Sequence, residues 1–306
     1  MKLKKIDTAS DNPLYGILLY SGCVLCFALL GTAARYFNGV YPVNELIFFR
    51  SIVTIFIILS SAAWKKNKQI FKTNRPKIHF LRSLIGFSAL TLLTLSYMEL
   101  PLADASTIQY TSPFFVALFA WPILGERISM KQAIAILVGF SGIFFAFNPD
   151  LDNLNMGMVY GFLGTILTSL VSIFLRDMGK TENPITTVLY FNCICALISG
   201  GWLLYNWVTP SFSHLLLFLM LGVIAYFAQT FFTHSYKWAP AGLLAPFNYV
   251  GIIWYGALGY LIFGDLPSNT LLIGCSLVVC SGLYMVYLEI QKKKMVNQAS
   301  YGQIRR

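Results

Sequence analysis

Long apolar stretches, separated by short polar connections, follow one another along almost the whole chain. A bilayer core about 30 Å thick requires roughly 20 apolar residues in each helix that crosses it. Ten stretches come close to that length, and the first, fourth and ninth of them are interrupted by polar residues. They cover residues 14–34, 44–64, 79–98, 103–124, 130–147, 157–177, 185–207, 214–235, 241–263 and 269–288. The pattern predicts an all-α integral membrane protein with ten transmembrane helices and almost no soluble domain.

The composition agrees with this prediction. Of the 306 residues, 57% are hydrophobic and 11% are charged, which is far from the averages of soluble proteins. The first stretch is too long for the apolar region of a signal peptide and is followed by further spans, so we expect it to be a membrane helix. The six cysteines all fall inside predicted spans, where thiols usually pack as small apolar groups. We therefore expect no metal site and no cofactor.

The net charge of +10 is gathered on one side of the predicted membrane. If the N-terminus is cytoplasmic, all but three of the 22 Lys and Arg residues lie in cytoplasmic segments; the exceptions are Arg35, in an outer connection, and Arg50 and Arg82, within spans. Lys and Arg are enriched in cytoplasmic loops of membrane proteins. We therefore expect both termini to be cytoplasmic, the lipid bilayer to be the main partner, and no nucleic acid to bind.

Residues 101–129 and 240–268 match each other at a constant spacing. The matched pairs, each 139 positions apart (240 − 101 = 139), are Pro101 with Pro240, Tyr110 with Tyr249, Gly125 with Gly264, Glu126 with Asp265, and Ser129 with Ser268. The amides of Gln109 and Asn248 fall in the same register. A shared register across a helix, a loop and the next helix start indicates an internal repeat.

The repeat predicts two five-helix units at 14–147 and 157–288, followed by a basic cytoplasmic tail at 289–306. Because five is odd, the second unit must enter the membrane from the opposite side, so the two repeats are inverted. Many transporters build two exchangeable conformations from inverted repeats, with the substrate site near the midplane between them.

Polar residues inside the fourth and ninth spans suggest where such a site lies. At 1.5 Å per residue, Gln109 lies roughly 9 Å from the outer boundary and Asn248 about 10 Å from the inner one. Pro113 and Pro246 each remove a backbone hydrogen bond nearby. Irregular backbone at membrane depth is tolerated where it is buried in protein or lines a wet cavity. These residues predict a central pocket, although kinked packing helices joined by amide hydrogen bonds would give the same pattern.

Charged residues within spans are costly and usually face protein, water or a partner. Arg50, six residues into the second span, is a candidate for an anionic group of the substrate or for pairing with Glu45. Arg82 lies close to the inner boundary of its span, and we expect it to extend to the interface.

Aromatic rings on the candidate pocket helices can stack on a planar ligand or hold a cation. Tyr97, Tyr110, Tyr249 and Trp254 are the candidates, with Tyr255 beside them.

No acid is predicted near the midplane. Glu45, Glu99, Asp104 and Asp265 lie near outer boundaries, and Glu126 lies near the inner one. Glu45 is the best candidate for proton coupling, but a facilitator or exchanger fits equally well. The paired acids, Ser–His sets or metal sets of intramembrane hydrolases are not visible, so we do not expect an enzyme. A receptor or scaffold that does not transport remains an alternative.

The stretches "LPLADASTIQYTSPFFVALFAWPILGERIS", "GFSGIFFAFNP" and "APAGLLAPFNYVGIIWYGALGYLIFGDLPSNTLLIG" resemble the EamA family of the drug/metabolite transporter superfamily. The resemblance covers nearly the whole chain. It implies a bacterial inner-membrane carrier in which spans one to four and six to nine enclose the pathway, while five and ten lie at the edge.

Within that family the "TPS" loop at 209–211 and the "APFNY" stretch are similar to S-adenosylmethionine uptake carriers of intracellular bacteria. Those carriers commonly have Tyr-Arg-Tyr where this chain has Phe247, Asn248 and Tyr249. The resemblance implies a small polar organic substrate, amino acid-like or nucleoside-like, S-adenosylmethionine included, taken up by a monomer or homodimer. Other members of the family export amino acids or metallophores.

The charge pattern makes a testable prediction about topology. Reporter fusions after Lys77 and after Arg306 should both give a cytoplasmic signal, because these segments hold most of the cytoplasmic Lys and Arg residues. A periplasmic signal at Arg306 would show that ten spans is the wrong number.

Overall fold

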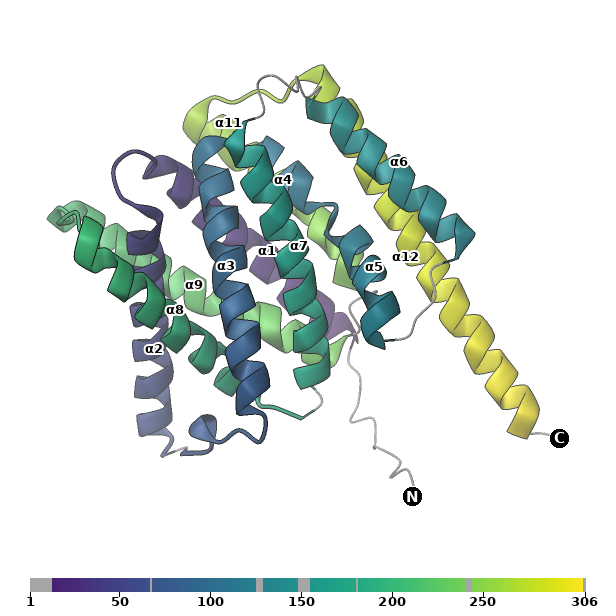
Figure 1. The fold of residues 1–306 in the computed structure, drawn as a ribbon, viewed down its shortest axis with the longest axis horizontal. Helices are drawn as coiled ribbons and strands as arrows, with labels where there is room; N and C mark the ends of the chain where they lie inside the picture. The colour runs from purple at the N-terminus through teal and green to yellow at the C-terminus, as the bar shows by residue number, and fades with distance from the viewer. Residues whose placement is uncertain are drawn as a thin grey trace.

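The computed structural model describes residues 13–66, 68–124, 129–147, 155–179, 181–239 and 244–304, and every regular element in these ranges is helical. The helices of the first half are α1 (Pro13–Tyr36), α2 (Val43–Trp64), the 3₁₀ helix η1 (Lys68–Phe71), α3 (Pro76–Glu99), α4 (Leu102–Gln109), α5 (Ser112–Leu124) and α6 (Met130–Phe147). Those of the second half are α7 (Met156–Met178), α8 (Pro184–Asn206), α9 (Phe212–Trp238), the 3₁₀ helix η3 (Ala245–Val250), α11 (Gly251–Phe263) and α12 (Asn269–Ile304). Figure 1 shows their arrangement.

Length and composition make this a multi-pass membrane protein. In the described part of the chain, α1, α2, α3, α7, α8 and α9 are each long and apolar enough to cross a bilayer. Shorter apolar helices lie at 130–146, 247–263 and 269–285. If α4 with α5, and η3 with α11, each form one span, the helices account for the ten expected spans.

The fourth and ninth spans are broken where the sequence predicts irregular backbone. The first break falls between α4 and α5, next to Pro113, which has no N–H to donate to the Gln109 carbonyl one turn earlier. In the ninth span the residues from Ala245 to Val250, including Pro246, form the tighter 3₁₀ helix before α11 begins.

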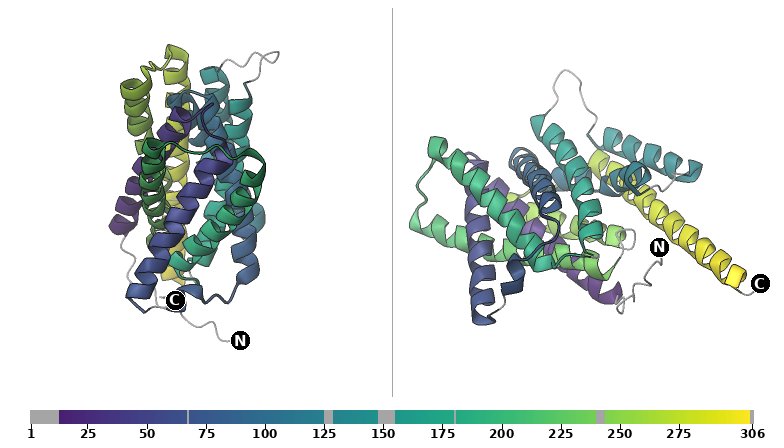
Figure 2. Two further views of the ribbon diagram at one scale, coloured as in Figure 1. Left: turned by 90° about the vertical axis from the view of Figure 1, so that its left-hand side faces the viewer. Right: turned by 60° about the horizontal axis from the view of Figure 1, so that its bottom comes forward.

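Helices far apart in the sequence pack in pairs. The main pairs are α1 with α9, α3 with α7, α2 with α8, α4 with α11, and α6 with α12. The α6–α12 pair lies at one edge of the bundle, and the C-terminal part of α12 projects beyond the other helices (Figures 1 and 2). The segment predicted as a tail after residue 288 is therefore helical as far as Ile304.

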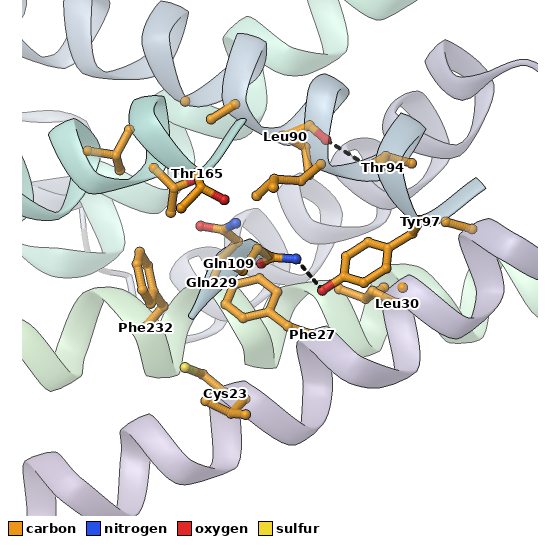
Figure 3. A pocket seen from close by; sticks show the side chains of 18 of the residues that line it. Cys23, Phe27, Leu30, Leu90, Thr94, Tyr97, Gln109, Thr165, Gln229 and Phe232 are labelled. Carbon is orange, nitrogen blue, oxygen red and sulfur yellow. Dashed lines mark hydrogen bonds between the residues drawn. The ribbon is translucent and has the colours of Figure 1, made fainter. Parts of the chain in front are cut away.

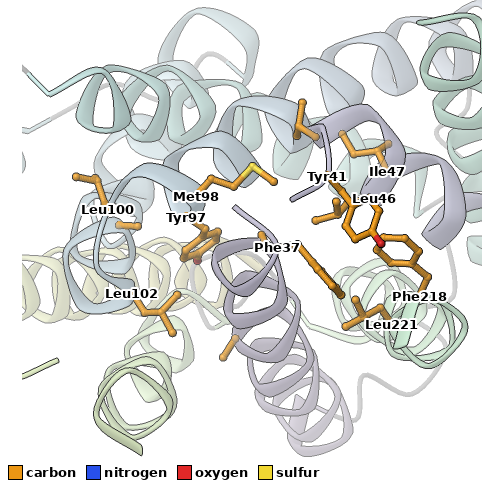
Figure 4. Close-up of a cluster of buried hydrophobic side chains, with 14 of the residues drawn as sticks. Phe37, Tyr41, Leu46, Ile47, Tyr97, Met98, Leu100, Leu102, Phe218 and Leu221 are labelled. Atoms are coloured by element: carbon orange, nitrogen blue, oxygen red, sulfur yellow. The ribbon is translucent and has the colours of Figure 1, made fainter. Parts of the chain in front are cut away.

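The largest buried cluster lies where α1, α2, α3 and α9 meet. Phe37 packs on Phe218 with ring centroids 5.0 Å apart, and Tyr41 lies 5.1 Å from the same ring (Figure 4). Leu46, Ile47 and Leu221 are buried in the same cluster. Apolar side chains that contact protein on all sides are stabilised by dispersion. These contacts fix the end of α1 relative to α2 and α9.

Polar contacts connect the ends of paired helices. Arg35, near the end of α1, pairs with Asp265, which follows α11, and its guanidinium carbon lies 4.3 Å from the Phe263 ring centroid. His79 Nε2 on α3 lies 3.2 Å from Glu182 Oε2, just after α7. Further contacts of this type join Arg75 Nη2 to Asp177 Oδ2 at 2.6 Å, and Tyr41 Oη to His214 Nδ1 at 2.9 Å. Glu126, the matched partner of Asp265, lies outside the described residues.

Small residues allow α6 and α12 to approach closely. A Cβ atom on Gly142 would lie 2.9 Å from the Gly274 carbonyl oxygen, and one on Gly274 would overlap both Gly142 and Ala146. Small residues at such crossings are a common means of helix association in membranes.

We therefore expect Gly274→Leu to destabilise the protein. The new side chain has no room at the crossing, and overpacking typically costs about 1–3 kcal/mol. The thermal unfolding midpoint of purified protein in detergent should fall. Gly201→Leu on α8 is the matched control, because a Cβ there meets nothing within 4 Å. An unchanged midpoint for Gly274→Leu would show that α6 and α12 are not held by this crossing.

Candidate binding cavity

A cavity lies in the middle of the bundle, with about 170 Å³ open to the centres of water molecules. Its wall comes from α1, α2, α3, α4, α5, α7, α8, α9, η3 and α11. None of its described lining residues belongs to α6 or α12. The helices at the edge of the bundle therefore take no part in the wall, whereas all eight other spans contribute to it.

Two stacked tyrosines and an amide form one side of the cavity. Tyr97 on α3 stacks on Tyr255 of α11, with ring centroids 5.4 Å apart and planes 15° apart. Gln109, the last residue of α4, donates from Nε2 to the Tyr97 hydroxyl at 2.5 Å (Figure 3). Because the helix breaks immediately after Gln109, its side chain is presented at the end of a helix rather than along one. The arrangement places the Gln109 amide beside the hydroxyl end of a buried pair of stacked aromatic rings.

Further polar groups surround the same space. Figure 3 shows Gln109 and Gln229 both projecting into the volume between Phe27, Thr165 and Phe232. The Gln229 Oε1 atom is buried and has no hydrogen-bond partner among the described residues. Asn248 of η3 also lines the cavity. The Ser and Thr residues of the wall are Thr94, Ser112, Thr165, Thr168 and Ser172.

Two arginines lie on the wall. Arg50 on α2 is 7% exposed and Arg82 on α3 is 1% exposed. The prediction that Arg82 extends to the membrane boundary is wrong. Its helix begins at Pro76, earlier than the apolar pattern suggests, so Arg82 lies six residues inside it, about 9 Å from the helix start. Because the Arg82 side chain is buried, it points into the bundle and not toward the membrane boundary.

Three of the aromatic candidates are not on the cavity wall. Tyr110 and Tyr249 contact each other, with ring centroids 5.6 Å apart, inside a buried cluster against α6 and α12. Trp254 is 36% exposed on the outer surface of α11. The internal repeat therefore brings Tyr110 and Tyr249 together, but in a packing role between the bundle and its edge helices.

Glu45 does not meet Arg50 or the cavity. It is fully buried in the first turn of α2, where its Oε2 accepts from the Val208 backbone N–H at 3.2 Å. The carboxylate connects α2 to the segment after α8, and its position near a helix N-terminus is electrostatically favourable.

The sequence analysis missed Gln229 and the aromatic side chains of Tyr20, Phe27 and Phe232. An amide inside an apolar span was the signal that identified Gln109, and Gln229 in "YFAQTFF" carries the same signal. The aromatic residues carry none, because similar residues face lipid elsewhere in the chain. Only the packing of α1 against α9 selects them.

A bundle of membrane-spanning helices around a central cavity that has polar groups in its wall, with broken helices beside it, is the architecture of a membrane transporter. The chain belongs to the EamA-like transporter family, whose model matches residues 14–148 and again residues 155–288. The resemblance seen in the sequence is thereby confirmed.

Similar proteins include carriers with different named functions. The chain is 26% identical to the S-adenosylmethionine uptake transporter of Rickettsia prowazekii (strain Madrid E), over 95% of this chain and 98% of that protein. It is 25% identical to the pseudopaline exporter CntI of Pseudomonas aeruginosa, over 86% and 93%. A solved crystal structure shares the fold with a TM-score of 0.66 at 17% identity, covering 91% of this chain and 98% of that one.

The cavity makes a prediction about water access. In a cysteine-free background, Gln109→Cys and Asn248→Cys should react with a small water-soluble thiol reagent, because both positions line the cavity. Ala105→Cys, on the same helix as Gln109 but fully buried outside the cavity, is the control and should not react. Labelling is measured by the mass of the purified protein. No labelling at 109 and 248 would mean that the amides are packing contacts.

Proposed function

We propose that this protein moves a small polar organic solute across the bacterial inner membrane by alternating access, with the solute held in the central cavity. The observation that carries the proposal is the cavity itself. It lies between the two sequence repeats, its wall combines amides, hydroxyls and stacked aromatic rings, and eight spans converge on it. Both termini are cytoplasmic in this proposal, as the charge pattern predicts.

The helix pairs support an inverted-repeat architecture. If the two repeats are exchanged, each span takes the place of the span five positions away. Span three (α3) then becomes span eight (α9), and span six (α7) becomes span one (α1). The α3–α7 pair is thereby exchanged for the α9–α1 pair, and the structure contains both. The contacts of α2 with α9 and of α3 with α8 are exchanged in the same way, and the α2–α8 and α6–α12 pairs map onto themselves. Two matches to one family model, each over about half of the chain, agree with this division.

The repeat extends to the residues around the cavity. Ser96 and Tyr97 on α3 recur as Ser235 and Tyr236 on α9, again 139 positions apart (235 − 96 = 139). Tyr97 Oη accepts from Gln109, whereas Tyr236 Oη donates to Ser172 at 3.2 Å. Equivalent tyrosines thus make different contacts in this conformation, which is expected if alternating access exchanges the environments of the two repeats.

The residues that we assign to the solute are Gln109, Asn248, Tyr97 and Arg50, with Tyr255 and Gln229 beside them. Tyr110, Tyr249 and Trp254 are left out of the assignment because they do not line the cavity in this conformation. The amides bind polar groups of the solute, and the Tyr97–Tyr255 stack provides a surface for a planar or apolar part. An amino acid-like or nucleoside-like solute has both kinds of group.

The relatives support S-adenosylmethionine as the first substrate to test, with uptake as the direction. The similarity to a pseudopaline exporter supports a second candidate, the export of a metallophore or amino acid through the same cavity. Glu45 stays the candidate for proton coupling, although its contact with Val208 does not connect it to the cavity.

Proteoliposomes test the proposal. Purified protein should accumulate one or more solutes from a labelled panel of S-adenosylmethionine, amino acids and nucleosides, and unlabelled solute on the opposite side should accelerate exchange. Asn248→Leu should reduce the rate per folded molecule about tenfold, because a buried solute group loses its hydrogen-bond partner.

Gly201→Leu, on the outer surface of α8, is the control for reconstitution. Transport of none of these solutes in either direction by folded protein would contradict the proposal and favour a receptor or scaffold.

A further inference from the structure

We propose that Arg50 and Arg82 together form an anion subsite for a carboxylate group of the transported solute. The inference rests on the proposed function and adds a requirement that the cargo must meet. The presence of two buried guanidinium groups on one cavity wall, with no acid among the described residues of that wall, carries it.

Neither arginine is neutralised by the protein. The ion pairs among the described residues are Arg35 with Asp265, Arg75 with Asp177, and His79 with Glu182, so neither cavity arginine belongs to one. Arg50 Nη2 and Arg82 Nε and Nη1 are buried nitrogen atoms that have no hydrogen-bond partner in the described structure. Buried charges in proteins are normally paired and hydrogen-bonded, because the unpaired state is costly.

The two side chains converge from different helices on one region of α8. Arg82 extends over the ring of Phe191, with its guanidinium carbon 4.3 Å from the ring centroid. Gly86, one turn after Arg82, permits this contact, since a Cβ there would lie 2.9 Å from the Phe191 ring. Arg50 reaches the same cavity from α2, and both α2 and α3 pack against α8. The two guanidinium groups therefore belong to the wall of one cavity.

The contact with Phe191 orients Arg82 without neutralising it. An aromatic face attracts the guanidinium group but accepts no hydrogen bond in the plane of its N–H donors. The buried Nε and Nη1 donors of Arg82 thus have no partner among the described residues, and their planar fork matches the two oxygens of a carboxylate. The rest of the wall has amides, hydroxyls and aromatic rings and no further Lys or Arg, so it suits the uncharged or zwitterionic remainder of a solute.

A carboxylate fits better than a phosphate monoester at this site. Arg50 and Arg82 are the whole positive charge of the described wall, and two charge-assisted contacts satisfy the two oxygens of one carboxylate. A phosphate has a third oxygen and a second charge, for which no further cation lies on the wall. Solutes that differ only in the carboxylate should therefore differ strongly in affinity.

The experiment uses pairs of probes that differ only at this group: S-adenosylmethionine against decarboxylated S-adenosylmethionine, and L-methionine against L-methioninamide. The unfolding midpoint of purified full-length protein in detergent is measured with each probe, and inorganic phosphate is a further arm. We expect a carboxylate probe to stabilise the wild type with at least tenfold higher affinity than its partner. Equal effects of both members of a pair that binds, or stabilisation by phosphate alone, would overturn the proposal.

Substitutions of the two arginines give a second test, which needs no ligand. Because neither arginine has an ion-pair partner among the described residues, Arg82→Met and Arg50→Met should leave the midpoint of ligand-free protein unchanged or higher and should abolish the preference for carboxylate. Arg82→Lys, which keeps the charge but loses the planar fork, should retain part of the preference. Arg176→Met, on α7 outside the cavity, is the matched control and should retain all of it.

The ligand-free arm also separates this proposal from the proposed function. A lower midpoint for both Met variants would show that the guanidinium groups are structural, and it would overturn the subsite even if transport is found. Carboxylate-dependent stabilisation without transport of any solute would support the subsite and contradict the transport function. If no probe stabilises the wild type, lower midpoints of the two Met variants contradict the subsite, and unchanged or higher midpoints support it.

Discussion

The absence of hydrogen-bonding partners in the bilayer core is the constraint on which this structure depends. Each backbone N–H and C=O must be satisfied inside the protein, so the spans are helices, and a helix can break only where protein or an enclosed cavity surrounds the break. Both broken spans contribute wall residues to the cavity, Gln109 from one and Asn248 from the other. The same constraint makes buried charge costly, so two arginines on the cavity wall that have no acid beside them in the described part of the chain call for a ligand.

The bundle separates packing from binding. Close packing between α6 and α12, through Gly142 and Gly274, occurs at the edge, and Tyr110 and Tyr249 join that pair to the rest. The cavity is built by the other eight spans, whose ends are connected by contacts such as Arg35 with Asp265 and His79 with Glu182. A carrier must open alternately at each end, and polar contacts at helix ends can exchange their partners for water at less cost than a packed apolar core can separate.

Relatives with different named substrates are compatible with this design. The S-adenosylmethionine and pseudopaline carriers match this chain over most of its length, although their named substrates differ. The Phe247-Asn248-Tyr249 stretch is one place where this chain departs from the pattern common in S-adenosylmethionine carriers, and Asn248 is in the wall. In the proposed subsite the anionic group of the cargo is bound by Arg50 and Arg82, and not at this position.

The sequence by itself determined the helical membrane class, the spans and the family, because apolar length and the matched motifs are properties of the chain alone. It also identified Gln109, Asn248, Arg50 and Tyr97 as polar or aromatic residues in unusual positions. The tertiary structure decided which of these share a cavity. Tyr110 follows Gln109 directly, yet the helix break turns the two side chains to different surroundings. Arg82 was misjudged since hydropathy does not mark where a helix begins, and Gln229 meets Gln109 only through the packing of helices that are distant in sequence.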